Sequence, residues 1–109
     1  MRVIFLLLLL MSTACGHVVT THRILGAQRA IMKAEHRQAD EFAIYEITKA
    51  REYLHKAKEE EGYADYQVSM RYGQLSIDHA EKAREQAITN RGQSLQERSI
   101  NPNKEQNEP

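Results

Sequence analysis

The sequence predicts an all-α protein, built as a long antiparallel two-helix hairpin that resembles a short coiled coil. Its central segment is dense in Ala, Glu, Lys, Arg and Gln, which lose least on entering a helix, and the whole chain of 109 residues contains only two prolines and no tryptophan. Small residues also recur every seven positions on both sides of a turn signal at residues 62–65. The length suits one small domain.

The first fourteen residues follow the three-part plan of a secretory signal peptide. Met1-Arg2 supplies a positive start, residues 3–11 are an unbroken apolar run, and Ser12-Thr13-Ala14 is small and weakly polar. As a helix the apolar run covers about 13 Å, less than half of the roughly 30 Å hydrocarbon layer of a bilayer. We therefore expect residues 1–14 to be cleaved rather than retained as a membrane span.

The only cysteine of the chain, Cys15, follows this leader directly. A lone cysteine cannot form an internal disulfide or supply a multi-cysteine metal site. Ala14-Cys15 resembles the lipobox of bacterial lipoproteins, in which the cysteine thiol is acylated and the leader is cut just before it. Ser12 departs from that pattern, which usually has an aliphatic residue there, so 12–14 also reads as an ordinary cleavage site that leaves a free thiol.

Two alternatives follow for the location of the protein. In the first, acyl chains on Cys15 anchor it in a membrane. By resemblance to lipoproteins of double-membraned bacteria, Gly16 after the cysteine implies the outer membrane, facing the periplasm. In the second, the protein is soluble and secreted, and Cys15 has no special role.

The rest of the chain divides into a tether, two helices and a tail. Residues 15–22 are expected to form a lipidated tether, because they carry β-branched residues and no helical period. The domain spans 23–98, with one helix over about 23–61 and a second over about 66–98. Gly62 suits the left-handed position after a helix end and Asp65 suits the next N-cap. Residues 99–109 are polar after Ile100, contain both prolines, and are expected to be disordered.

Two series of small residues suggest how the hairpin pairs. Members of each series lie seven positions apart: Ala43, Ala50 and Ala57 in the first helix, and Gly73, Ala80 and Ala87 in the second. An antiparallel pairing matches 57 with 73, 50 with 80 and 43 with 87. Small residues along the seam let the two helix axes approach closely.

A second apolar stripe on the first helix lies well away from this seam and comprises Ile24, Ala27, Ile31, Ala34, Phe42 and Tyr45. Either the helix breaks near residues 36–41 and its first part packs on the hairpin, or the stripe contacts another molecule. Tyrosines also gather near the turn, where they either cap the core or form a recognition patch. The candidate interaction surface therefore comprises Ile24, Ile31, Phe42, Tyr45, Tyr53, Tyr63 and Tyr66.

Residues 50–87, AREYLHKAKEEEGYADYQVSMRYGQLSIDHAEKAREQA, resemble a domain of unknown function found in small bacterial lipoproteins. The shared features are an Ala-rich first helix, a Gly-Tyr-x-x-Tyr turn and an A-x-x-A-x-x-x-A pattern in the second helix. The resemblance implies an envelope lipoprotein and brings no catalytic residues with it.

The sequence offers little chemistry for catalysis. Its five histidines form no HExxH pair, and it has no G-x-S-x-G, no phosphate-binding glycine loop, and equal numbers of basic and acidic residues. We therefore expect no enzyme activity, cofactor, metal or nucleic-acid partner.

The sequence thus predicts a membrane-anchored periplasmic lipoprotein whose hairpin contacts another envelope protein or a second copy. One alternative is a module that binds cell-wall glycan or a small ligand through the tyrosines near the turn. The other is a soluble secreted helical protein without lipid.

Overall fold

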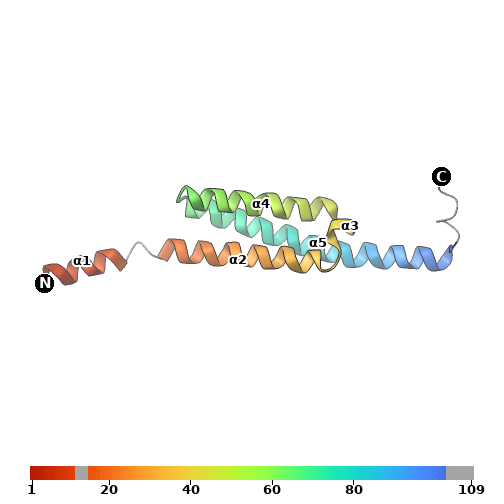
Figure 1. Cartoon of the computed structure of the whole chain (residues 1–109), viewed down its shortest axis with the longest axis horizontal. Helices are drawn as coiled ribbons and strands as arrows, with labels where there is room; N and C mark the ends of the chain where they lie inside the picture. The colour runs from red at the N-terminus through yellow and green to blue at the C-terminus, as the bar shows by residue number, and fades with distance from the viewer. Residues whose placement is uncertain (12–14, 103–109) are drawn as a thin grey trace.

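The computed structural model describes the backbone of residues 1–11 and 15–102, and the side chains of residues 1–7 and 17–102. This part of the chain contains five helices and no strand, as Figure 1 shows: α1 (Arg2–Met11), α2 (Cys15–Glu35), α3 (Ala39–Phe42), α4 (Ile44–Gly62) and α5 (Tyr66–Ile100). The all-α prediction is confirmed. The molecule is elongated, with extents of 82 × 20 × 14 Å.

The predicted single helix over 23–61 is wrong and the alternative of a break near residues 36–41 is confirmed, because α2 ends at Glu35 and α4 begins at Ile44. Between them the chain makes a tight turn in which Gln38 adopts a left-handed conformation with φ of 64°. The N–H groups of Arg37 and Gln38 donate to the carbonyl oxygens of Ala34 and Glu35. The break allows α2 to lie alongside α5 and also to contact α4, so that its apolar stripe packs within the molecule (Figure 1). The domain is therefore a bundle of three long helices, in which α2 packs against the pair α4 and α5.

Three side-chain hydrogen bonds record how α5 passes along α4. Ser69 Oγ donates to the carbonyl of Ala57 at 2.6 Å, and Ser76 Oγ donates to that of Ala50 at 2.7 Å. Further along, Asn90 Nδ2 donates to the carbonyl of Phe42 at 2.6 Å. Residue numbers thus rise along α5 as they fall along α4 and α3. The bonded residues are spread over most of the length of α4.

Small residues fill the core of the bundle. All members of the two seven-residue series are buried, as the sequence predicts: Ala43, Ala50, Ala57, Gly73, Ala80 and Ala87. On the side of Gly73 where a Cβ atom would lie, the nearest atoms belong to Arg23 on α2, because α2 covers this part of α5.

The turn between α4 and α5 differs from the prediction in one residue. Asp65 is the N-cap of α5 and its side chain accepts a hydrogen bond from the N–H of Val68, so that part is confirmed. Gly62, however, is the last residue of α4, and the left-handed residue is Ala64, with φ of 61°. The chain places the left-handed conformation two residues later than the glycine would favour.

The predicted tether over residues 15–22 is also wrong, since these residues form the first turns of α2. Thr20 is fully buried, and Thr21 Oγ1 lies within hydrogen-bonding distance of both the His17 carbonyl and Glu61 Oε1. The His17 ring meets the Tyr66 ring edge-on at 6.0 Å. Packing against the α4–α5 turn therefore outweighs the weak helix preference of the β-branched residues.

The far end of the bundle is held by one arginine. Arg51 on α4 donates to Glu35, at the end of α2, and to Asp40 in α3, each at 2.6 Å. Hydrogen bonds to Glu35 and Asp40 raise the pKa of Arg51. This side chain thereby connects α2, α3 and α4 where the chain turns between residues 35 and 44.

Helix α5 continues to Ile100, two residues past the predicted end, so the start of the predicted disordered tail is helical. Residues 103–109, the greater part of that tail, lie outside the described residues.

Candidate functional site

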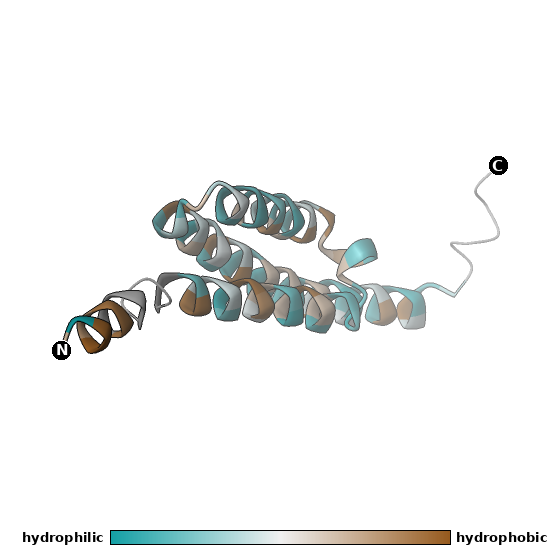
Figure 2. Ribbon diagram, turned by 60° about the vertical axis from the view of Figure 1, so that its left-hand side comes forward, coloured by the Kyte–Doolittle hydropathy of each residue, from teal (hydrophilic) through white to brown (hydrophobic). Residues whose placement is uncertain are grey.

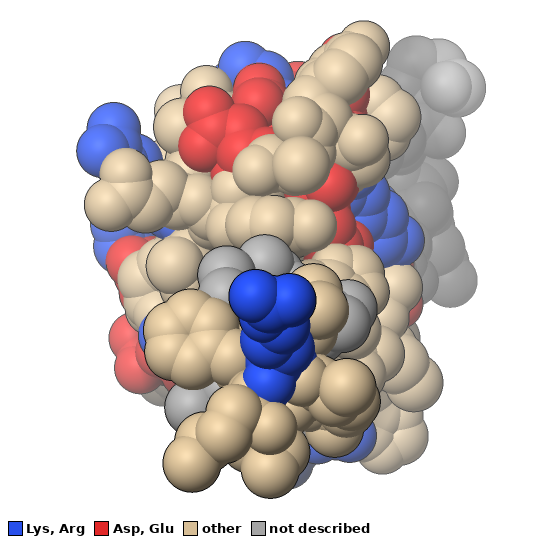
Figure 3. Space-filling model, turned by 90° about the vertical axis from the view of Figure 1, so that its left-hand side faces the viewer, with Lys and Arg blue, Asp and Glu red and all other residues tan. Residues whose placement is uncertain are grey.

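The leader and the start of α2 form one end of the molecule. Helix α1 lies beyond the bundle, and most of its described side chains are apolar and exposed (Figures 1 and 2). Figure 3 looks at this end, where uncharged side chains surround a basic side chain at the centre of the view. Cys15 is the first residue of α2, although its side chain and the whole of Ala14 lie outside the described residues.

Within the described part of the chain, we find no helix long and apolar enough to cross a membrane.

Two members of the candidate interaction surface are core residues. Ile24 and Ile31 on α2 are 6% and 5% exposed, so this part of the prediction is corrected. They become buried because the interruption of the helix between α2 and α4 turns their face of α2 toward the bundle. Phe42 is half-buried and packs against the core, whereas Tyr45 remains exposed on α4.

The tyrosines near the turn do not form one patch. Tyr53 on α4 stacks on Tyr72 of α5 at a ring distance of 6.0 Å, and on His79 at 5.3 Å. Tyr66 contacts His17, as described above. Tyr63 lies apart in the turn and is 75% exposed.

The Tyr53 stack continues into two charged groups. His79 Nδ1 lies 2.5 Å from Glu46 Oε2, and both side chains are largely shielded from solvent. At the other end, Lys56 Nζ lies 5.5 Å from the centre of the Tyr72 ring. Sequence reasoning missed the Glu46–His79 pair because the two residues are 33 positions apart and show no local motif. The rings mainly fix the α4–α5 seam.

The described residues contain no group of three or more His, Cys, Asp or Glu side chains placed to hold a metal ion. Glu46 and His79 therefore stand as a pair between helices.

Sequence reasoning also missed the free end of α5. Beyond Asn90 every residue of this helix except Ser94 is exposed, and α5 extends past α3 as a single helix (Figure 1). Ile88 and Leu95 are 49% and 55% exposed. They lie seven residues apart, which puts them on one side of the helix. The i, i+7 spacing of these two apolar residues is visible in the sequence, but it does not show whether they pack inside the molecule or face solvent.

Comparison with protein families gives one match. A family model described as Domain of unknown function (DUF4398) matches residues 23–98. Comparison with curated proteins and with solved structures gives no match.

Proposed function

This chain belongs to the DUF4398 family of domains of unknown function, and on that premise we propose that it is a bacterial envelope lipoprotein that binds another protein. Acyl chains on Cys15 would hold it in the outer membrane, facing the periplasm, after cleavage behind Ala14. The mature domain is then an antiparallel hairpin of α4 and α5 with α2 packed along it.

The placement of the leader supports the anchor. The described side chains Val3 to Leu7 of α1 are 59–73% exposed, so the domain does not depend on them for its core. Among the side chains described after the leader, His17, two positions after Cys15, already contacts Tyr66 and Glu61. Removal of residues 1–14 would therefore leave the domain intact and place the modified cysteine at its first helical turn.

Intact mass and membrane fractionation of the protein made in a bacterial host test the anchor, with Cys15→Ser as the matched variant. The anchor predicts a chain that begins at Cys15, carries added acyl mass, is released only by detergent, and becomes soluble in the variant. An unmodified chain found in the soluble fraction would instead favour the secreted alternative.

The free end of α5 is the observation that carries the protein-binding part of the proposal. A single helix in water is only marginally stable through its own backbone hydrogen bonds. Most of the stability of helices in proteins comes from packing an apolar face against another element. Ile88 and Leu95 form such a face and remain about half exposed beside Arg37, which lines the same shallow hollow. The anchor and this surface lie toward opposite ends of the molecule (Figure 1).

Site-specific photocrosslinking in cells tests this surface. A crosslinker at position 88 or 95 is expected to yield a defined adduct, either with another envelope protein or with a second copy. Crosslinkers at Gln86 and Gln93 provide the matched control, because these residues are also exposed and seven apart but lie on the opposite side of α5. Equal adducts at all four positions, or none at 88 and 95, would refute the proposal.

The glycan-binding alternative has less support from the arrangement of the tyrosines. Sugars stack on a free aromatic face, whereas Tyr53 and Tyr72 stack on each other. Tyr63 is the most exposed of the turn tyrosines, so Tyr63→Ala is the sharpest test. Loss of sedimentation with purified cell wall in this variant would favour glycan binding over the protein-binding proposal.

A further inference from the structure

The outer side of α2 carries a line of exposed apolar residues. Val18, Leu25 and Met32 lie seven residues apart and are 65%, 44% and 65% exposed. At about 100° per residue, this line lies roughly 110° around the helix from the buried residues Ile24 and Ile31. Helix α2 therefore has one apolar face in the bundle and a second, narrower one directed outward.

Basic side chains border this line, and acidic ones are absent from it. Between residues 17 and 34 the chain has no Asp or Glu, and it has three cations, Arg23, Arg29 and Lys33. Arg29 and Lys33 are exposed, and the described residues supply no ion pair to either. The nearest acid on α2, Glu35, is already bound by Arg51.

An open groove between α2 and α5 runs beside the same line. Near the start of α2 its walls include Val18, Val19 and Ile77. Further along, Arg29 and Lys33 face Arg84 of α5 across it, with Glu81 as its one acidic residue. The surface thus changes from mainly apolar close to Cys15, where His22 and Arg23 also line the groove, to basic farther along the helix.

From this arrangement we infer that the outer face of α2 lies flat on a lipid bilayer that contains anionic headgroups. Val18, Leu25 and Met32 would enter the boundary between headgroups and acyl chains, and Arg29, Lys33 and Arg84 would lie next to lipid phosphates. A helix with apolar residues and lysines or arginines on one face, and no acids there, has the composition of interfacial helices.

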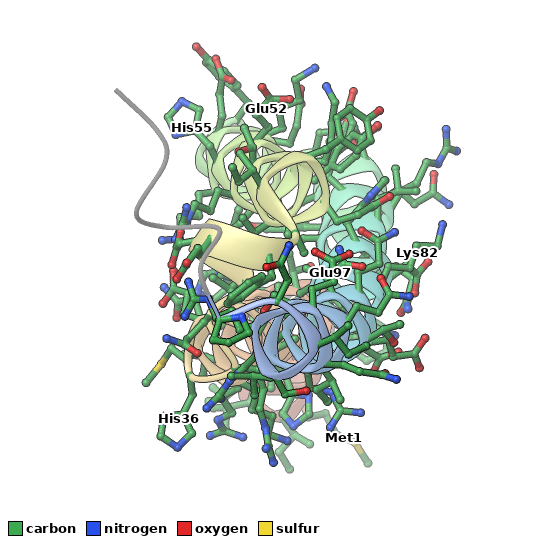
Figure 4. The ribbon with its side chains drawn as sticks, turned by 90° about the vertical axis from the view of Figure 1, so that its right-hand side faces the viewer. Met1, His36, Glu52, His55, Lys82 and Glu97 are labelled. Carbon is green, nitrogen blue, oxygen red and sulfur yellow. The ribbon has the colours of Figure 1, made fainter. Side chains whose placement is uncertain are left out.

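This inference rests on the proposed anchor, and the position of Cys15 strengthens it. Val18 is about 4.5 Å along the helix axis from Cys15, so acyl chains on the cysteine would bring the first exposed turn to the bilayer surface. The rest of the α2 face is then held close to the bilayer at a high effective concentration. A low intrinsic affinity of this face for lipid is therefore enough to keep it bound. His36 directly follows the last residue of α2. Glu52 and His55 on α4 lie on the opposite side of the molecule from it, away from the proposed membrane face (Figure 4).

The depth of single fluorescent labels in vesicles tests the orientation. Leu25→Cys and Met32→Cys are introduced separately into the full lipoprotein, in which the Cys15 thiol is blocked by its acyl chain, and His55→Cys is the control. The proteins are reconstituted in phosphatidylcholine vesicles with a minority of phosphatidylglycerol and with lipids brominated near the headgroups. A flat α2 predicts that labels at 25 and 32 both lose most of their emission, whereas the label at 55 keeps it.

The charge requirement is tested in the same vesicles. Arg29→Glu with Lys33→Glu should restore emission from the label at 32, and so should replacing phosphatidylglycerol by phosphatidylcholine. Lys58→Glu with Lys82→Glu changes the net charge equally at exposed positions outside this face and should leave quenching unchanged.

The outcomes separate this inference from the proposed anchor, because intact mass shows independently whether Cys15 is acylated. An acylated protein whose label at 32 is not quenched overturns the flat orientation and leaves the anchor standing. Quenching at 32 that is insensitive to both charge changes overturns the role of the anionic headgroups. A chain without acyl mass overturns the anchor and the orientation built on it.

Discussion

Arg23 on α2 lies across Gly73 on α5 so closely that a Cβ atom at position 73 would be 2.8 Å from the Arg23 Cγ. Arg23 Nη1 also donates a hydrogen bond to Gln74, the residue that follows Gly73 on α5. The glycine therefore leaves room for the arginine stem, which covers it.

Replacement of Gly73 should consequently weaken the bundle. Gly73→Ala gains helix propensity, but Arg23 must move away from α5, and we expect a net loss of about 1 kcal/mol in the free energy of unfolding. The control is Gly92→Ala on the same helix, where an added Cβ would meet nothing within 4 Å. This control should gain about 0.5–1 kcal/mol. Urea unfolding followed by circular dichroism measures both, and equal stabilisation would contradict the close contact.

The left-handed residue in the α4–α5 turn makes a second prediction. Ala64 has φ of 61°, a conformation that is unfavourable for any residue with a Cβ atom. Ala64→Gly should raise the free energy of unfolding by about 0.5–1 kcal/mol, since relief of strain exceeds the extra freedom of glycine in the unfolded chain. Ala57→Gly, in the buried helix, should lower it by about 1 kcal/mol. Destabilisation by Ala64→Gly would show that the turn is not left-handed at this residue.

The buried serine at the α4–α5 seam makes a third prediction. Ser76 is fully buried, and its hydroxyl donates to the carbonyl of Ala50. Ser76→Ala should cost about 1 kcal/mol for the lost hydrogen bond, and Ser76→Leu about 1–3 kcal/mol because the seam has no room for the larger side chain. Ser94→Ala, whose hydroxyl bonds only within α5, should change stability by less than about 0.5 kcal/mol. Thermal unfolding of the three variants ranks them, and tolerance of leucine would contradict the tight seam.

The ion pair on the exposed side of α4 makes a prediction about pH. Lys49 Nζ lies 2.8 Å from Glu52 Oε2, and the hydrogen bond from Lys49 lowers the pKa of Glu52 from its ordinary value of 4.5. The same contact raises the pKa of Lys49 above 10.5. The pair therefore stabilises the fold above pH 4.5, and this contribution is lost as the pH falls through the lowered pKa of Glu52.

An NMR titration checks this sign directly. The Glu52 carboxyl should titrate below 4.5 in the native chain and move upward in Lys49→Gln, which keeps the side chain polar but uncharged. A midpoint unaffected by this substitution would mean that the pair does not persist in solution. Because both groups are exposed, we expect the effect on overall stability to be small.

The candidate site follows from the sequence only in part. The apolar stripe that includes Ile24 and Ile31 was visible as a pattern, but the pattern is the same whether the stripe packs inside one chain or between two. Likewise, four tyrosines close in sequence suggest a patch, yet their helical positions direct Tyr53 toward Tyr72 and leave Tyr63 in the turn. Side-chain direction depends on the rotation of each helix, which short-range patterning does not specify.

The local chemistry of the chain by itself determined the helical class, the presence of a turn just after Gly62, the Asp65 cap and the burial of the small residues every seven positions. Those features depend on helix propensity, capping and periodicity, which act over a few residues. The break between α2 and α4 was decided only in the tertiary structure, because Gln38 is no helix breaker and its left-handed conformation is unfavourable in isolation. The chain adopts it since an unbroken helix would leave the Ile24 to Ala34 stripe in water, whereas the turn buries that stripe against α5.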